Sequence, residues 1–192
     1  MDDPGSMSAG NIIVKLVILL VLILVNAFFA MSELAIISLN DNKIDKMAED
    51  GNKKAKKIVK LTENSSKFLS TIQIGVTLAG FLTSASASTT FASMITDALR
   101  GTVVYNALGE GLINGIAVVI VTIIMSYFSL VLGELVPKKI AMQVPEKISF
   151  KIVDILLLFS KLFAPLDKIL SVSTNAVVRL LGFNPHADEE TV

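Results

Sequence analysis

Three long apolar segments constrain the fold of this chain more than any other feature. They cover about residues 12–39, 68–94 and 112–135, and each is long enough to cross a bilayer as a helix. A segment in hydrocarbon must satisfy its own backbone hydrogen bonds, and a helix does this. Hydrophobic residues also make up 53% of the 192 residues, above the usual share in soluble domains. We therefore expect an all-α membrane protein with three transmembrane helices.

The distribution of positive charge predicts the orientation of these helices. The loop over residues 40–67 is rich in lysine, whereas the loop over residues 95–111 has Arg100 as its only basic residue. Cytoplasmic loops carry the excess of lysine and arginine. The N-terminal tail, residues 1–10, is therefore expected outside, and the C-terminus in the cytoplasm. The prediction is a multi-pass protein of the cell (inner) membrane.

The lysine-rich loop is expected to hold a juxtamembrane helix over residues 41–63. Apolar residues, among them Ile44 and Ile58, recur there at helical spacing with lysines between them. Asn40 or Asp41 could cap the start of this helix. Its lysines would then lie near anionic lipid headgroups. The alternative is a solvated basic linker.

The segment after the third span is ambiguous. Residues 148–166 are apolar enough to form a fourth span, but the charges in and beside this segment fall within one arc of a helical wheel: Lys147, Lys151, Asp154 and Lys161. This arc and a turn expected at Pro165 favour a cytoplasmic-side helical hairpin over residues 146–182, with Gly182 as a C-cap. The polar residues 183–192 are expected to be a truncated linker to cytosolic domains of a larger protein.

Each expected span also has a face of small and polar residues. These are Asn26, Ala30 and Glu33 on the first, Gln73, Thr77, Gly80 and Ser84 on the second, and Thr122, Ser126, Ser129 and Gly133 on the third. Small and hydroxyl residues at this spacing let helices approach closely, so packing alone is one explanation. Packing does not explain the ionisable and amide side chains, which favour an ion path.

The end of the third span has the features of half a cation site. Glu134 is an ionisable residue at the edge of hydrocarbon, where it is costly. Pro137 has no N–H, so the carbonyl of Gly133 is expected to lack its helical partner. A free carbonyl beside a carboxylate suits a hard cation. The alternative is a proline-ended helix with Glu134 at the headgroups.

The remaining composition narrows the chemistry. The chain has no cysteine and one histidine, His186 in the polar tail, which argues against zinc or iron. Oxygen ligands alone point to Mg²⁺, Ca²⁺ or Na⁺. Lys15 lies near the far end of the first span, so a bound cation is expected to supply the counter-charge of the carboxylates. A net charge of zero gives nucleic-acid binding no support, and no catalytic pair or phosphate-binding loop suggests an enzyme.

Three motifs together resemble a known family. Residues 26–35 in the first span, residues 71–80 in the second and Gly133–Lys138 in the third are similar to the transmembrane domain of the CorC/CNNM (cyclin M-like) magnesium transporters. The resemblance covers about residues 11–182. It implies a homodimeric three-span domain with cytosolic juxtamembrane helices, which exports Mg²⁺ with Na⁺ as the coupling ion. Family members continue into CBS modules that bind adenine nucleotide, so nucleotide control is not expected within this chain.

The resemblance also implies a set of site residues. The expected ligands of a dehydrated Mg²⁺, at a site facing the cytosol, are Asn26, Glu33, Thr77, Ser84, Gly133 and Glu134. The residues expected to line the ion path are Ala30, Gln73, Gly80, Ser126 and Ser129, with Pro137 as the helix break. One alternative function is a membrane-embedded Mg²⁺ sensor or anchor that does not conduct. Another is a Na⁺- or H⁺-coupled carrier of a different substrate.

Overall fold

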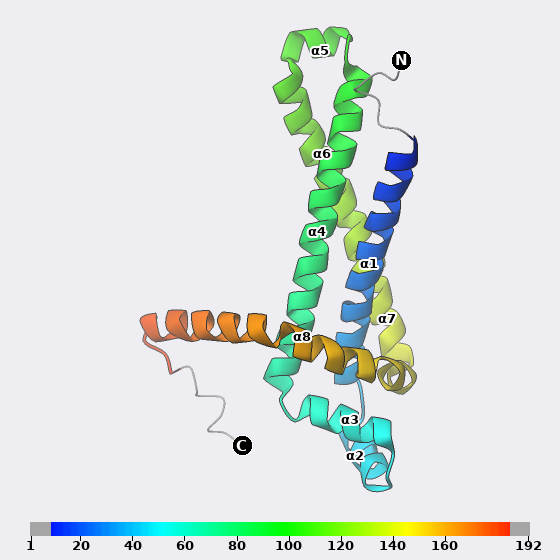
Figure 1. The fold of residues 1–192 in the computed structure, drawn as a ribbon, viewed down its shortest axis with the longest axis vertical. Helices are drawn as coiled ribbons and strands as arrows, with labels where there is room; N and C mark the ends of the chain where they lie inside the picture. Colours follow the sequence, from blue (N-terminus) through cyan, green and yellow to red (C-terminus); the bar gives the residue numbers. More distant parts are fainter. Residues whose placement is uncertain (1–8, 185–192) are drawn as a thin grey trace. The chain divides into compact units, whose positions relative to one another are not determined.

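The computed structural model describes residues 9–184, and over this range the regular elements are all helices, without strands. The helices are α1 (Ala9–Ile37), α2 (Asp41–Glu49), α3 (Lys53–Thr62), α4 (Ser65–Leu99), α5 (Val103–Leu108), α6 (Glu110–Leu130), a π-helical turn η1 (Val131–Leu135), α7 (Val136–Gln143) and α8 (Pro145–Leu180) (Figure 1). The expected all-α class is therefore confirmed. The expected tail and linker lie mostly outside the described residues, although Ala9 and Gly10 already belong to α1.

Three helices of the described chain are long and apolar enough to cross a membrane. They are Gly10–Ile37, Ser65–Leu99 and Glu110–Gln143, the last running through α6, η1 and α7. The second and third extend beyond the expected limits at both ends. Hydropathy marks only the apolar middle of a helix, whereas caps and turns decide where the helix stops. The number and order of the expected spans are confirmed.

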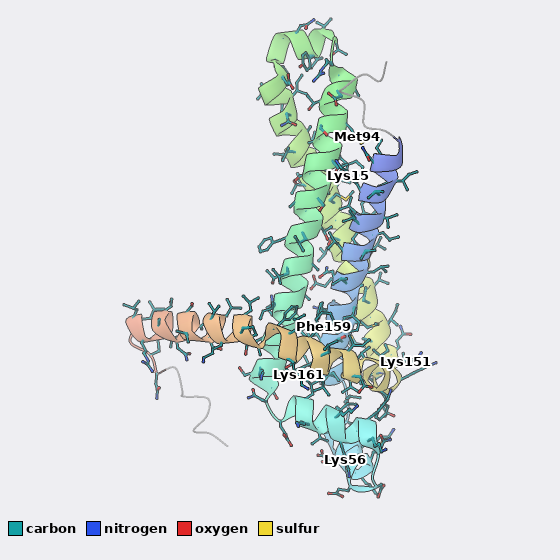
Figure 2. All side chains as sticks on the ribbon, in the orientation of Figure 1. Lys15, Lys56, Met94, Lys151, Phe159 and Lys161 are labelled. Carbon is teal, nitrogen blue, oxygen red and sulfur yellow. The ribbon has the colours of Figure 1, made fainter. Side chains whose placement is uncertain are left out.

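The helices form two compact units, and the first comprises residues 1–39 and 75–148. In its described part, Leu19, Ala87 and Val121 form a small buried cluster that joins α1, α4 and α6. Elsewhere α1 lies against η1 and α7. Lys15 lies near the start of α1 (Figure 2).

Most large apolar side chains of α1 and α6 are exposed on the outside of this first unit. They include Ile13, Val17, Leu20 and Leu24 on α1, and Val119, Ile123 and Tyr127 on α6. Only 17% of the most apolar window of the first span and 11% of that of the third are buried. Such a surface would be an aggregation hazard in water, so it fits a hydrocarbon environment.

The second unit comprises residues 40–74 and 149–192, and it corrects the expected single helix over 41–63. Two short helices, α2 and α3, stand in its place. Gly51 adopts a φ of +94°, which ends α2, and the Asn52 side-chain carbonyl accepts hydrogen bonds from the N–H groups of Lys54 and Ala55 at the start of α3. The expected cap of the first helix is confirmed at Asn40, whose side chain accepts from the N–H of Lys43.

The expected hairpin over 146–182 is also wrong, because α8 is one helix that continues through Pro165. The proline removes one hydrogen bond, to the carbonyl of Lys161, and costs about 3 kcal/mol. The apolar face of α8 outweighs this cost, with Ile152, Val153 and Leu156 buried. The helix is not among those able to span a membrane, so the fourth-span alternative gains no support.

Side chains of α3 fasten it to α8 within the second unit. The Lys54 ammonium donates to the carbonyl of Phe150 over 2.6 Å, and Lys57 pairs with Asp154. Lys56 projects from α3, and Lys151 and Lys161 project from α8 (Figure 2). Gly182, with a φ of +83°, follows the end of α8 and confirms the expected C-cap.

Candidate ion-binding site

An open cavity of about 330 Å³, with both polar and apolar lining residues, lies in the first unit, between α1, α4, α6 and η1. Of the residues predicted for the site, seven line it: Asn26, Thr77, Gly80, Ser84, Ser126, Ser129 and Glu134. Three apolar residues complete the wall: Val76, Phe81 and Leu130. The polar faces of three separate helices therefore meet at one place.

Asn26 is the most unusual residue of this cavity. Its side chain is 4% exposed, and its carbonyl oxygen Oδ1 is buried without a hydrogen-bond partner in the described structure. A buried polar atom that lacks a partner costs about 1–3 kcal/mol. Such atoms are rare in folded proteins, and each needs an explanation, a bound ion being one.

Gly133 lies directly against Asn26. A Cβ atom at position 133 would come within 2.8 Å of the Asn26 Nδ2 atom, closer than non-bonded atoms allow. Only glycine therefore lets η1 approach the Asn26 amide so closely. Gly133 is buried but does not itself line the cavity, whereas the next residue, Glu134, does.

The helix does not end at Pro137, contrary to the expected break. The chain instead makes the π turn η1, in which the N–H of Val136 bonds the carbonyl of Val131, and then continues as α7 to Gln143. Proline is tolerated at the first positions of a helix because the N–H groups there have no intrahelical partner. Single π turns occur often at functional sites. Here the turn holds both Gly133 and Glu134.

A lysine supplies the counter-charge that was expected from a bound cation. The Lys138 ammonium lies 3.0 Å from Glu134 Oε1 and 3.1 Å from Glu33 Oε2. The expectation that no basic residue faces these carboxylates is therefore wrong. It assumed that the helix ends before Lys138, whereas the continued helix places Lys138 one turn after Glu134.

The other predicted residues lie elsewhere. Glu33 belongs to the ion-pair network and does not line the cavity. Ala30 is fully buried on α1 and is absent from the cavity wall. Gln73 is exposed and belongs to the part of α4 assigned to the second unit. Ala30 and Gln73 were expected to line the ion path, but neither lines this cavity.

The apolar wall of the cavity and Lys138 were not identified from the sequence. For two of the apolar residues, however, helical spacing places them on the same face as a predicted residue. Phe81 lies four residues after Thr77, and Leu130 lies four residues after Ser126, so each shares a face with a predicted residue. Within residues 9–184, no three His, Cys, Asp or Glu side chains gather in a metal-binding group. The oxygen atoms offered to a cation in the cavity thus come from one carboxylate, one amide and several hydroxyls.

These features define a helical membrane domain with an open cavity between its spans, at which polar side chains of several helices meet. Comparison with known proteins identifies its family. The chain belongs to the family described as the cyclin M transmembrane N-terminal domain, which matches residues 17–192.

Several curated proteins are similar to the chain over most of its length. The UPF0053 protein sll0260 of Synechocystis is 36% identical over 189 residues, which are 96% of this chain and 41% of that protein. The UPF0053 protein YugS of Bacillus subtilis is 28% identical, over 94% of this chain and 41% of its own length. The UPF0053 inner membrane protein YfjD of Escherichia coli is 30% identical, over 82% and 33%. The chain thus spans about two fifths of these relatives or less.

Proposed function

We propose that this chain is the membrane domain of a magnesium transporter, and that it binds dehydrated Mg²⁺ in the cavity between its spans. The observation that carries the proposal is the buried Asn26 carbonyl oxygen without a protein partner, on a residue that lines the same cavity as Glu134. A cation would supply the missing partner. The family is defined by a transmembrane domain rather than a catalytic one, which supports transport.

The chemistry of the cavity suits Mg²⁺. This ion takes six oxygen ligands at about 2.0–2.1 Å and gives up its water reluctantly. We place Asn26 and Glu134 at the ion, with Thr77 and Ser84 as further ligands from α4; the predicted Gly133 ligand would require its carbonyl to turn toward a cavity that Gly133 does not line. A water occupies about 30 Å³, so the cavity of about 330 Å³ is large enough to admit the dehydrated ion.

The wider assignment follows from the family resemblance. We propose Mg²⁺ export coupled to Na⁺, by a homodimer whose helices rock to expose the site alternately. The domain would lie in the cell (inner) membrane, and its relative YfjD is itself named an inner membrane protein. The relatives are longer than this chain, so CBS-type cytosolic domains of the whole protein are proposed to control the cycle.

The test is Mg²⁺ flux in proteoliposomes that contain the purified chain, with and without a Na⁺ gradient. Glu134→Gln should abolish the flux because it removes the only carboxylate on the cavity wall. Glu63→Gln makes the same chemical change at an exposed position and should leave the flux intact. Na⁺-dependent flux would support the proposed coupling.

Other outcomes separate the alternatives. Mg²⁺ binding without flux would favour a membrane sensor that reports to cytosolic domains. Flux of a different ion that competes with Mg²⁺ would favour another carrier. Unchanged Mg²⁺ binding in Glu134→Gln would contradict the role of this carboxylate as a ligand.

A further inference from the structure

We infer that Lys138 is a tethered competitor of the transported cation, which holds Glu134 when the cavity is empty and must release it when an ion binds. The inference rests on the proposed function, since it concerns the same carboxylate. It starts from one contact, the Lys138 ammonium placed about equally far from Glu134 and Glu33, at 3.0 and 3.1 Å. The three side chains are each about three tenths exposed. Water therefore screens the charges of this network only in part.

Glu134 belongs to two groups of residues. It lines the cavity together with Asn26, and it pairs with Lys138. Neither Lys138 nor Glu33 lines the cavity. Glu134 is thus the one member of the ion-pair network that can reach an ion there. In the described structure its Oε1 atom already accepts a hydrogen bond from Lys138.

A divalent ion and the ammonium compete for this carboxylate. Mg²⁺ binds carboxylate oxygens at about 2 Å. With Lys138 still in place, an ammonium and a divalent ion would share one carboxylate at a separation of a few ångströms. Their repulsion is weakly screened in a partly buried site. Binding of Mg²⁺ therefore requires Lys138 to move away from Glu134.

The charges of the network give the direction of this effect. Two carboxylates and one ammonium sum to −1, so a divalent ion brings the group to +1 and a monovalent ion brings it to zero. Without the ammonium, a divalent ion would bring the net charge of the group to zero. Lys138 thus lowers the affinity for a divalent ion more than for a monovalent one. A weaker site also releases its ion faster, which transport needs.

Glu33 gives the displaced ammonium a partner. When Glu134 turns to the ion, Lys138 keeps its contact with Glu33 and is not left as an unpaired charge, which would be costly. Glu33 is therefore a positioning residue, which acts on the ion through Lys138. This explains why a predicted ligand lies outside the cavity and yet belongs to the site.

The experiment measures the Mg²⁺ dissociation constant of the purified chain in detergent by calorimetry, at fixed ionic strength. Lys138→Gln should bind Mg²⁺ about tenfold more tightly, because the competing charge is gone. Lys139→Gln is the matched control, with the same loss of charge at the adjacent, exposed position, and should change the constant by less than about twofold. Lys138→Arg keeps the charge in a planar guanidinium that can donate hydrogen bonds to both carboxylates. This variant should bind Mg²⁺ more weakly than the original chain.

Glu33→Gln distinguishes a positioning role of Glu33 from a purely structural one. It should weaken Mg²⁺ binding in the original chain, since Lys138 then has Glu134 as its remaining partner. The same substitution should have a smaller effect in the Lys138→Gln background. Equal effects in both backgrounds would show that Glu33 acts on the ion by its charge alone and would overturn its positioning role.

The failures of the two proposals are distinguishable. If the original chain binds Mg²⁺ and Lys138→Gln binds it equally or more weakly, the competition by Lys138 is overturned and the proposed function stands. If neither binds Mg²⁺, the proposed function fails and the inference fails with it. If Lys138→Gln does not elute as a folded species in gel filtration, Mg²⁺ binding is measured in Lys138→Arg instead. Binding that is unchanged or tighter in Lys138→Arg would overturn the inference.

Discussion

Asn26 has a buried carbonyl oxygen that the described protein leaves without a hydrogen bond, and this predicts a gain in stability when the amide is removed. Leucine has nearly the same shape as asparagine and no polar atom. Asn26→Leu should raise the free energy of unfolding by about 1–3 kcal/mol without Mg²⁺ and should remove the stabilisation by Mg²⁺. Thermal unfolding of the purified chain, with and without Mg²⁺, measures both effects.

Ser32 on the same helix provides the control for this prediction. It is also fully buried, but its hydroxyl donates to the carbonyl of Phe28 over 2.6 Å. Ser32→Ala therefore loses a satisfied hydrogen bond and should be destabilised slightly, with the effect of Mg²⁺ retained. A loss of stability in Asn26→Leu, with the Mg²⁺ effect intact, would contradict a ligand role for the amide.

At the residue scale, the sequence predicted the polar groups of the cavity but not their partners. Asn26 and Glu134 stand out because amide and carboxylate side chains are costly within an apolar helix. The role of Lys138 depended on whether the helix continues past Pro137, and the type of residue does not decide that. The exclusion of Ala30 from the cavity depended on the rotation of α1 against its neighbours, which only packing determines.

At the scale of elements, the π turn η1 connects the proline to the site and predicts the effect of replacing it. Pro137→Ala restores an N–H and lets the chain return to regular α-helical bonding, which removes the extra residue of the π turn. One residue of helix corresponds to about 100° of rotation, so Glu134 would change its direction relative to Asn26. We expect weaker Mg²⁺ binding, measured by calorimetry, together with equal or higher thermal stability.

Pro165 is the matched control, since it also lies inside a helix. Pro165→Ala should raise stability by up to about 3 kcal/mol and leave Mg²⁺ binding unchanged, because α8 does not line the cavity. Tighter Mg²⁺ binding in Pro137→Ala would show that the π turn does not serve the site. A similar loss of binding in both variants would indicate a general effect of proline on the fold.

The contact between α3 and α8 predicts a dependence on pH. The hydrogen bond from Lys57 lowers the pKa of Asp154 below its ordinary value of 3.8. A carboxyl group with a lowered pKa stabilises the fold fully above its unfolded pKa and loses that effect as the pH falls through the folded value. Asp154→Asn should therefore lower the thermal midpoint at pH 7, and the difference from the original chain should shrink toward pH 3.

The effect should be small, since both side chains of this pair are 48% exposed and surface pairs contribute little. Asp167→Asn, on the same helix and without an ion pair among the described residues, should not show this pH-dependent difference. A difference for Asp154→Asn that stays constant between pH 7 and pH 3 would show that its carboxylate is not the group that titrates.

Some helix boundaries of this chain are predictable from sequence signals, and others are not. The sequence Gly51–Asn52 is a stop signal followed by a start signal, and giving it more weight would have divided the helix expected over 41–63. Pro165 does not end α8, because a long amphipathic helix tolerates one proline. The π turn leaves no signal in hydropathy, because it changes the backbone hydrogen bonding of the helix and not its apolar pattern.

At the scale of the whole molecule, the number of spans was predictable because the bilayer sets a length that apolar runs must match. Only 17% of the most apolar window of the first span and 11% of that of the third are buried within this chain, which fits a surface that faces a bilayer. The cavity lies where the polar faces of the helices meet, so small rotations of these helices, which the proposed transport requires, would change its lining.

The orientation in the membrane can be tested because the chain has no cysteine of its own. A single cysteine introduced at an exposed position is then the only thiol of this chain, so labelling of the purified chain reports on that position. Asn106→Cys, on α5 between the second and third spans, should react with a membrane-impermeant maleimide added to intact cells. Lys56→Cys, on the lysine-rich α3, should react only after the cells are permeabilised, because the positive-inside rule places it in the cytoplasm. The reverse pattern would invert the predicted topology, and the cavity would then face the opposite side with its proposed direction of transport.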